Sequence, residues 1–111
     1  MPLPHKVQEV EVNGKSPFGE WLRKLKDVEA AAAVLARIRR IEIAGGFGTY
    51  RYLAAGVFEL KIKTGPGYRV YFGLQKGYVV LLLGGGDKSS QDRDIRKATE
   101  LWQEYLKVIT E

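Results

Sequence analysis

Basic side chains alternate with apolar ones along two neighbouring segments of the chain, residues 57–63 and 68–75. Because successive side chains of a β-strand point to opposite faces, each segment predicts one apolar face and one polar face. The apolar faces are formed by Leu60, Ile62, Tyr68, Val70 and Phe72. The opposite faces carry Glu59, Lys61, Lys63, Arg69 and Tyr71. The sequence therefore predicts a cationic patch with one aromatic ring on a rigid pair of strands.

Such a patch has the side chains that RNA cleavage requires. Lysine and arginine bind phosphates, and a tyrosine ring can stack on a base. Attack by a 2′-hydroxyl on the adjoining phosphate needs a base, a group that stabilises the charge of the transition state, and an acid for the leaving oxygen. We predict catalytic roles for Lys61, Lys63 and Arg69, in which a lysine crowded by cations is the base and Arg69 stabilises charge. Tyr71 is the predicted stacking residue. The competing interpretation of the whole patch is that its charged side chains are simply solvated on the exposed face of the strands.

A second polar group occupies residues 87–94, after three consecutive glycines. Lys88 and Gln91 are candidate site residues there, beside the backbone amides of a helix start. The aspartates of this segment argue against an anion at the amides, and they favour an ordinary capped helix. Their spacing matches no known metal-ligand set, and Gly84–Gly86 lacks the pattern of a phosphate-binding loop.

The composition limits the class of protein. The 111 residues carry a net charge of +5, which favours a polyanionic partner such as nucleic acid. Cysteine is absent and His5 is the single histidine, which excludes thiolate and multi-histidine metal centres. The N-terminus has no apolar signal core, and the longest apolar runs are far too short to span a membrane. We therefore expect one cytoplasmic domain over residues 1–111, without metal or cofactor.

The N-terminal half predicts a strand and two helices. Residues 7–12 alternate as a short edge strand, and Asn13-Gly14 is a turn signal. Ser16-Pro17 is a typical helix start, and Asp27 can cap a second helix from Val28 to about Ala44 that Gly45-Gly46 ends. Two helices joined so closely predict an antiparallel hairpin.

The C-terminal half predicts four strands and a helix. Residues 50–53, 57–63, 68–75 and 78–83 have the period of strands, and their short connections require an antiparallel meander. The last of these strands is apolar on both faces, so it should be central or covered on both sides, and Gly84–Gly86 should break the sheet. A final helix should start near Ser89 or Ser90, with Asp92 completing a capping box, and should bury Ile95, Ala98, Trp102, Tyr105 and Ile109. The predicted fold class is α+β.

Three spaced motifs carry a resemblance to a known family. They are Val57-Phe58-Glu59-Leu60-Lys61-Ile62, Gly65-Pro66-Gly67-Tyr68-Arg69-Val70-Tyr71-Phe72, and residues 85–95 with the sequence GGDKSSQDRDI. Together with the segment 18–27, they resemble the addiction module killer protein branch of the RelE/HigB toxin superfamily. The resemblance runs from about Val7 to Lys107, and the loop 12–17 is longer than is usual in the family.

The resemblance implies a compact RelE-like fold and metal-independent endonucleolytic cleavage of mRNA, often on the translating ribosome. The implied partner is a cognate helix-turn-helix antitoxin. The arginine of the Tyr-Arg-Val motif falls on Arg69, the basic position after Glu-Leu falls on Lys61, and Lys63 matches a further basic residue. At the C-terminal basic position only Lys88, Gln91, Arg93 and Arg96 are present, so the general acid stays open between them.

Two other functions are compatible with the sequence. A RelE-like domain could bind RNA or the ribosome without cleavage, or act only as a co-repressor together with its antitoxin. A third hypothesis is an inhibitor of another enzyme, such as gyrase. Position-specific new 5′ ends in ribosome-bound mRNA would favour the nuclease, and their absence would favour the binding module. Topology assays on supercoiled DNA would test the inhibitor hypothesis.

Overall fold

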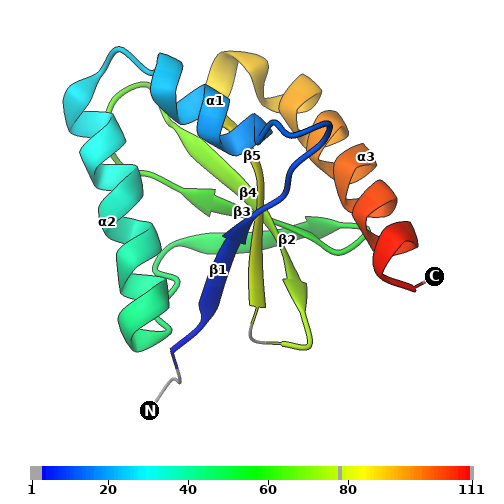
Figure 1. Cartoon of the computed structure of the whole chain (residues 1–111). Helices are drawn as coiled ribbons and strands as arrows, with labels where there is room; N and C mark the ends of the chain where they lie inside the picture. Colours follow the sequence, from blue (N-terminus) through cyan, green and yellow to red (C-terminus); the bar gives the residue numbers. More distant parts are fainter. Residues whose placement is uncertain (1–3, 78, 111) are drawn as a thin grey trace.

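A five-stranded sheet lies between two helical layers (Figure 1). The structure is a computed structural model that describes residues 4–77 and 79–110. In chain order, the elements are β1 (Lys6–Glu9), α1 (Pro17–Lys24), α2 (Val28–Ala44), β2 (Tyr50–Ala54), β3 (Val57–Lys61), β4 (Arg69–Gln75), β5 (Val79–Gly86), a 3₁₀ turn (Lys88–Ser90) and α3 (Gln91–Thr110). The predicted α+β class is confirmed.

The strands are ordered β1-β5-β4-β3-β2 across the sheet. Strands β2 to β5 form the expected antiparallel meander, and β1 lies parallel to β5 at the edge. β1 is shorter than predicted because the chain leaves the sheet after Glu9 and turns at Asn13-Gly14, where Val12 pairs with Lys15. The predicted central position of β5 is confirmed, although Tyr78 lies outside the described residues.

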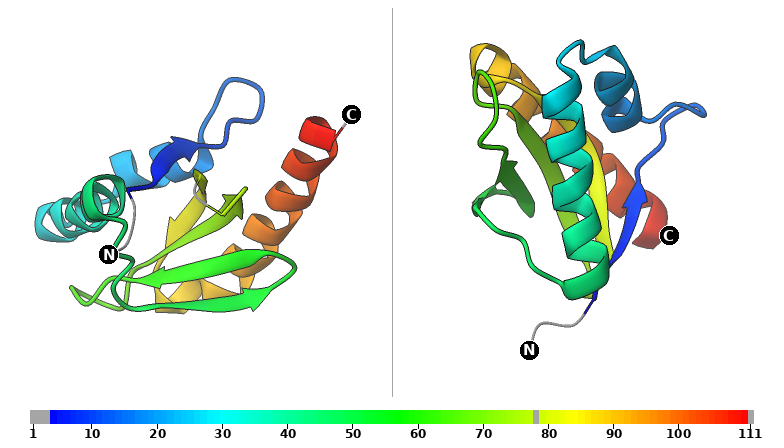
Figure 2. Two further views of the ribbon diagram at one scale, coloured as in Figure 1. Left: turned by 90° about the horizontal axis from the view of Figure 1, so that it is seen from below. Right: turned by 90° about the vertical axis from the view of Figure 1, so that its left-hand side faces the viewer.

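Local capping explains the first two helices. The Ser16 hydroxyl accepts a hydrogen bond from the Gly19 amide at 2.9 Å, and the Asp27 carboxylate accepts one from the Ala30 amide at 3.0 Å. Gly45 ends α2 with a left-handed φ of 71°, which costs glycine little. The chain changes direction between α1 and α2, and both helices lie on the same side of the sheet (Figure 2). The predicted antiparallel hairpin is wrong, because α2 runs across the direction of α1 (Figure 1).

Two apolar cores lie on the two faces of the sheet. The core under α1 and α2 contains the predicted apolar set of Leu60, Ile62, Tyr68, Val70 and Phe72. The core under α3 contains Tyr71, Leu81 and Leu83 from the sheet, with Ala98 and Trp102 from the helix. The predicted stripe of α3 is confirmed at its centre, whereas Ile109 is 39% exposed near the end of the helix. No helix in the described ranges has the length and apolar character of a membrane span.

The glycine run at residues 84–86 does not break the sheet, and that prediction is wrong. Gly85 pairs with Val70 and Gly86 with Arg69, so β5 continues to its last glycine. A Cβ on Gly85 would overlap the indole ring of Trp21, and one on Gly86 would overlap the carboxylate of Asp94. The glycines therefore allow the two helical layers to approach the strand closely.

The predicted start of the last helix near Ser89 or Ser90 is confirmed, because α3 begins at Gln91, but the predicted cap is corrected. Asp87, rather than Ser89 or Ser90, caps the turn, and its Oδ1 accepts hydrogen bonds from the amide of Ser89 at 2.8 Å and from its hydroxyl at 2.5 Å. Ser90 donates its hydroxyl proton to Asp94 at 2.5 Å. The serine hydroxyls are therefore engaged with aspartates, and one 3₁₀ turn precedes α3.

Candidate functional site

A cavity of about 350 Å³ opens where β2, β3 and β4 meet the first residue of α3. We call it the central pocket, and its lining residues are Thr49, Tyr50, Arg51, Glu59, Lys61, Arg69 and Gln91. Three predicted site residues, Lys61, Arg69 and Gln91, therefore meet in one place, although Gln91 is far from the other two in the sequence. Among the described residues, no three acidic or histidine side chains gather as a metal site would require.

Lys61 and Arg69 are direct register partners on β3 and β4. Cross-strand partners carry their side chains on the same face with Cβ atoms about 5 Å apart. Lys61 is exposed, and its ammonium makes no ion pair or side-chain hydrogen bond within the described ranges. Arg69, in contrast, is only 7% exposed. The pair therefore supplies one exposed cation, Lys61, and one buried cation, Arg69.

Glu59 organises the pocket, although the sequence alone did not indicate it as a site residue. This carboxylate is 3% exposed. Its Oε1 accepts a hydrogen bond from Arg51 Nε at 3.0 Å, and its Oε2 accepts one from Gln91 Nε2 at 2.8 Å. Arg69 Nε lies 3.6 Å from the same Oε2. Glu59 therefore connects three strands of the sheet to the start of α3.

A signal for Glu59 was present in the sequence. It lies two residues before Lys61 on β3, so strand alternation places both side chains on one face. An acidic residue inside a predicted cationic patch needs a partner if it is buried. Its register partner Arg51 is on β2, and this pairing could not be assigned from strand period alone.

Arg69 is held from two sides. One of its terminal nitrogens donates a hydrogen bond to the carbonyl of Gly67 at 2.5 Å, while Nε faces Glu59. Gly67 has a φ of 80°, and a Cβ there would lie 3.1 Å from the guanidinium. The turn before β4 therefore positions Arg69 through a residue whose backbone only glycine adopts without strain.

Tyr71 is not available to stack on a base, and that prediction is wrong. Strand alternation does place it on the same face as Arg69, but its side chain has no exposed area. The reason is that α3 packs over this part of the face through Ala98 and Trp102. Burial, and then the charges of Glu59 and Asp94, raise the pKa of the Tyr71 phenol, so it stays neutral.

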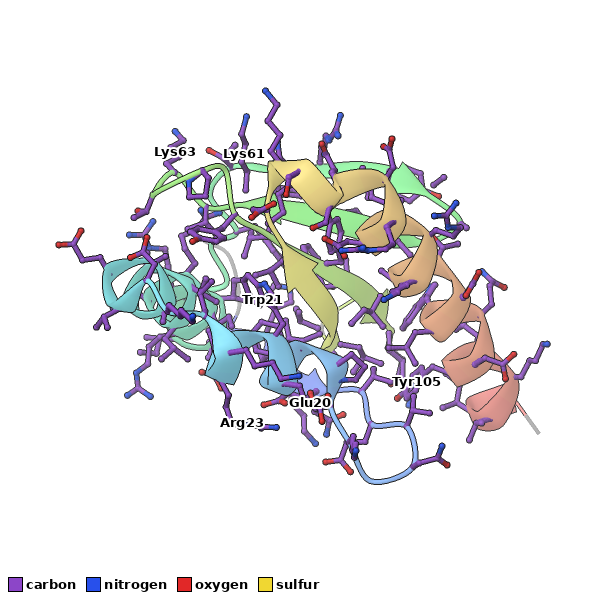
Figure 3. The ribbon with its side chains drawn as sticks, turned by 90° about the horizontal axis from the view of Figure 1, so that it is seen from above. Glu20, Trp21, Arg23, Lys61, Lys63 and Tyr105 are labelled. Atoms are coloured by element: carbon purple, nitrogen blue, oxygen red, sulfur yellow. The ribbon has the colours of Figure 1, made fainter. Side chains whose placement is uncertain are left out.

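The predicted catalytic set required Lys63 to lie beside Lys61 and Arg69. Lys63 does not line the central pocket with them. β3 ends at Lys61, and the three residues after it line a cavity together with α2. Lys63 instead lines a separate cavity of about 480 Å³, which we call the α2 pocket. Both lysines project from the same side of the molecule (Figure 3). The α2 pocket is lined by Ala33, Ala36, Arg37, Arg40, Gly48, Thr49, Ile62, Lys63 and Thr64.

The remaining predicted residues gather at the start of α3. Lys88, Arg93 and Arg96 are exposed and line a third cavity of about 650 Å³ together with Gln91, which we call the α3 pocket. Gln91 lines both this pocket and the central one. Lys88 itself does not line the central pocket. Hydrogen bonds from Ser89 hold the pKa of Asp87 below its ordinary value, so an anionic charge persists beside Lys88.

The three pockets form one surface because neighbours share a residue. Thr49 lines both the α2 pocket and the central pocket, and Gln91 lines both the central pocket and the α3 pocket. The combined surface presents cations from α2, β2, β3, β4 and α3, against two acidic residues, Glu59 and Asp92. A band of this charge favours contact with anions.

The fold and site define an α+β protein with a cationic cavity at one end of a mixed sheet. No protein-family model matches the chain. A protein of Haemophilus influenzae that is described as uncharacterized is 46% identical to it over 95 residues, which cover 86% of this chain and 95% of that protein. The chain belongs to the same family as this Haemophilus protein.

Proposed function

We propose that this protein is a metal-independent endoribonuclease that cleaves mRNA on the ribosome, as the toxin of a type II toxin–antitoxin pair. The observation that carries the proposal is the grouping of Lys61, Arg69, Gln91 and Glu59 around one cavity. The cationic band supports an RNA substrate, and the resemblance to RelE/HigB toxins supports the biological role. The proposed place of action is the cytoplasm, where mRNA is translated.

The proposed reaction is attack by the RNA's own 2′-hydroxyl. The 2′-oxygen forms a bond to the adjoining phosphorus, the bond to the 5′-oxygen breaks, and the products are a 2′,3′-cyclic phosphate and a free 5′-hydroxyl. One proton leaves the attacking hydroxyl and one reaches the leaving oxygen, so the reaction needs no other reagent. In this proposal Arg69, which is held by Glu59 and Gly67, stabilises the negative charge of the transition state.

Glu59 and Lys61 fit the two proton transfers. Lysine carries a proton at neutral pH, and the exposed ammonium of Lys61 can give it to the leaving oxygen. Glu59 is the carboxylate available to accept the proton of the 2′-hydroxyl. Its Oε1 is bonded to Arg51, whose side chain is 62% exposed and can turn to a substrate phosphate. This assignment replaces the lysine base that the sequence predicted, and it leaves Lys88 as a phosphate-binding residue.

Growth arrest tests the proposal. Expression without the antitoxin should stop growth, and Arg69→Lys should restore it, because a lysine keeps the charge but loses the planar donor geometry. The variant must be folded and present at the wild-type level. Full toxicity of that variant would contradict the nuclease mechanism.

A non-catalytic function is the alternative that the same cationic band supports. The band would hold RNA or ribosomal RNA through phosphates whether or not a bond is cleaved. In that case the protein would act as a binding module or as a co-repressor with its antitoxin. Ribosome-bound mRNA that acquires no new 5′ ends in the presence of the protein would favour this alternative.

For the antitoxin, we propose a groove on the opposite end of the molecule. It has a volume of about 800 Å³ and runs between the segment 9–12 and α3, and Tyr105 lies in it (Figure 3). Its apolar lining residues are Val10, Val12, Leu101, Tyr105 and Val108. Its charged lining residues are Glu9, Glu11, Lys97, Glu100 and Glu104. An acidic rim on a protein of net charge +5 favours a basic amphipathic helix as the occupant.

A further inference from the structure

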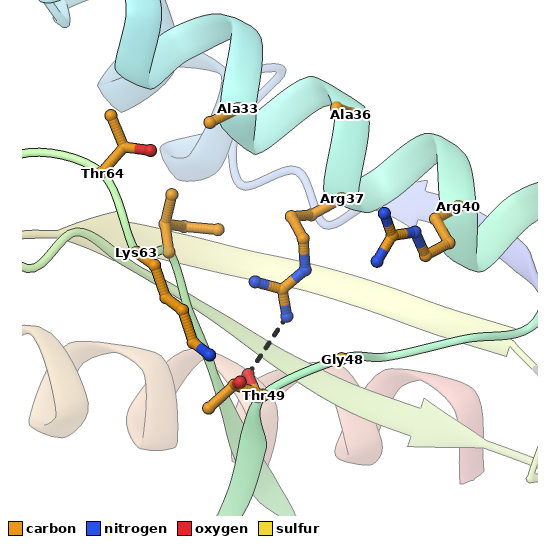
Figure 4. Close-up of a pocket in the computed structure, with 9 residues that line it drawn as sticks. Ala33, Ala36, Arg37, Arg40, Gly48, Thr49, Lys63 and Thr64 are labelled. Carbon is orange, nitrogen blue, oxygen red and sulfur yellow. Dashed lines mark hydrogen bonds between the residues drawn. The ribbon is translucent and has the colours of Figure 1, made fainter.

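The α2 pocket contains three cations and no acidic residue. Arg37 and Arg40 come from α2, and Lys63 comes from the segment after β3 (Figure 4). The hydroxyl residues Thr49 and Thr64 complete its polar lining. On the helix side the wall is formed by alanines at positions 33 and 36, whose small side chains leave room for a group to enter. The pocket therefore offers charge, hydroxyls and space to an anion.

Arg37 is fixed by three backbone carbonyls. It donates hydrogen bonds to Lys61 at 2.6 Å, to Phe47 at 2.6 Å and to Thr49 at 3.1 Å. The guanidinium passes close to Gly48, where a Cβ would lie 2.8 Å from a terminal nitrogen. Burial, and then the charge of Arg40, lower the pKa of Arg37. Because no acidic residue lines the pocket, no carboxylate there offsets the repulsion between Arg37 and Arg40.

Arg40 and Lys63 remain available for a ligand. Both are exposed, and in the described ranges neither side chain makes an ion pair or a hydrogen bond. Lys63 points toward Thr49, and Arg40 lies across the opening from it (Figure 4). An arginine beside a lysine is a typical phosphate-binding pair, because the arginine can give two parallel hydrogen bonds and the lysine adds a point charge.

The α2 pocket and the central pocket share a wall. Thr49 lines both, and its carbonyl accepts a hydrogen bond from the Lys61 amide at 3.0 Å and one from Arg37. The carbonyl of Lys61 is in turn bonded to Arg37. The catalytic candidate Lys61 and the anion-binding residues of α2 are therefore held in one hydrogen-bonded unit.

We propose that the α2 pocket binds a backbone phosphate of the same RNA strand whose neighbouring nucleotide occupies the central pocket. This inference rests on the proposed function, and it reassigns Lys63 from the chemical step to substrate binding. A strand that contacts both pockets gains affinity from at least one phosphate that is not cleaved. The protein should therefore prefer an oligonucleotide to a mononucleotide.

The test compares a double variant with a charge-matched control. Arg40→Ala/Lys63→Ala removes the two free cations, and Arg39→Ala/Lys76→Ala removes two exposed cations that line none of the pockets described above. The probe is a fluorescein-labelled single-stranded RNA of twelve 2′-O-methyl nucleotides, which cannot be cleaved by 2′-hydroxyl attack. Fluorescence anisotropy at several salt concentrations gives the affinity and the slope of log K against log salt.

We expect the Arg40/Lys63 double variant to bind about tenfold more weakly than the wild type. Its salt slope should fall by roughly 0.7 for each phosphate that the variant no longer binds. The control should change much less. Equal affinity and slope in the two double variants would refute the α2 pocket as a phosphate site while leaving the nuclease proposal intact. A wild type that binds no RNA at low salt would overturn the proposed function.

A second measurement does not depend on RNA. Inorganic pyrophosphate should shift the amide NMR signals of Gly48, Thr49 and Thr64 in the wild type, and the Arg40/Lys63 double variant should show no such shifts. Unchanged signals in the wild type would count against the pocket even if RNA is bound elsewhere.

Discussion

Arg69 and Glu59 face each other from adjacent strands with 3.6 Å between Nε and Oε2, and both side chains are more than nine-tenths buried. A buried charge that loses its partner costs about 3 kcal/mol or more of stability. Replacing Arg69 by alanine therefore combines an effect on folding with an effect on chemistry. Lysine at this position keeps a positive charge beside Glu59, so Arg69→Lys separates the two effects.

Glu59→Gln tests the proposed base. The amide keeps the shape of the carboxylate but cannot accept a proton, so we expect cleavage to fall by about 100-fold or more. Circular dichroism and urea unfolding establish that the variant is folded.

The matched control for Glu59→Gln is Glu42→Gln, at an exposed position on α2 that lines none of the pockets. It should retain the wild-type rate of cleavage. If Glu59→Gln cleaves at the rate of this control, Glu59 is not the base, and Lys61 returns as the candidate.

Tyr71→Phe tests the burial of the phenol. The pKa of Tyr71 is raised in the folded protein, so above pH 10 the unfolded chain loses this proton while the folded chain keeps it. The free energy of unfolding should therefore decline as the pH rises above 10, and the decline should be smaller in Tyr71→Phe. Urea unfolding at pH 8, 9, 10 and 11 measures both curves. Parallel curves would mean that the phenol titrates as if exposed.

Gly85→Ala tests the close contact between Trp21 and β5. The added methyl group overlaps the indole ring, and overpacking of this kind costs about 1–3 kcal/mol. Gly84→Ala is the control one residue away, because a Cβ there meets nothing within 4 Å. Urea unfolding should show reduced stability for Gly85→Ala and little change for Gly84→Ala. Equal stability of the two variants would be inconsistent with the described packing.

Charged substitutions at the rim of the apolar groove test the proposed antitoxin site. Val12 is 45% and Val108 is 71% exposed, so Val12→Asp and Val108→Asp should leave the fold intact. Each should weaken binding of a co-expressed helix-turn-helix antitoxin by about tenfold, because each places a carboxylate in the apolar lining of the groove, against the apolar face of the bound helix, where the charge loses its water. Calorimetric titration gives the affinity. Val28→Asp, at a residue that is 79% exposed outside the groove, is the control, and an equal effect in it would argue against the groove.

Local signals in the sequence predicted the local structure well. Ser16, Asp27 and Gly45 were identified as helix ends because capping depends on residues a few positions apart. The alternation of β3 and β4 predicted which side chains share a face, and the core under α1 and α2 confirms the apolar set. These predictions required no knowledge of distant contacts.

The errors came from contacts between distant segments. Tyr71 was placed on the correct face, but the docking of α3 decides that this part of the face is closed. The glycines at 84–86 predicted a break in the sheet, because the alternation of residues along a strand gives no information about the close packing of Trp21 against Gly85. Lys63 lies beyond the last paired residue of β3, so alternation no longer fixes its direction.

The candidate site was predictable only in part. Lys61 and Arg69 were found together because their strands are consecutive, and Gln91 joins them through its hydrogen bond to Glu59. The role of Glu59 as the shared partner of Arg51, Arg69 and Gln91 depends on the register of three strands. That register is a property of the assembled sheet.

Mapping of 5′ ends on ribosome-bound mRNA tests the central claim most directly. Purified wild-type protein, added to stalled ribosomes with a defined message, should generate position-specific new 5′-hydroxyl ends. Arg69→Lys, folded to the same extent, should generate them about 100-fold more slowly. Ends produced equally by both proteins, or no new ends with the wild type, would contradict the proposal that Arg69 and its pocket cleave RNA.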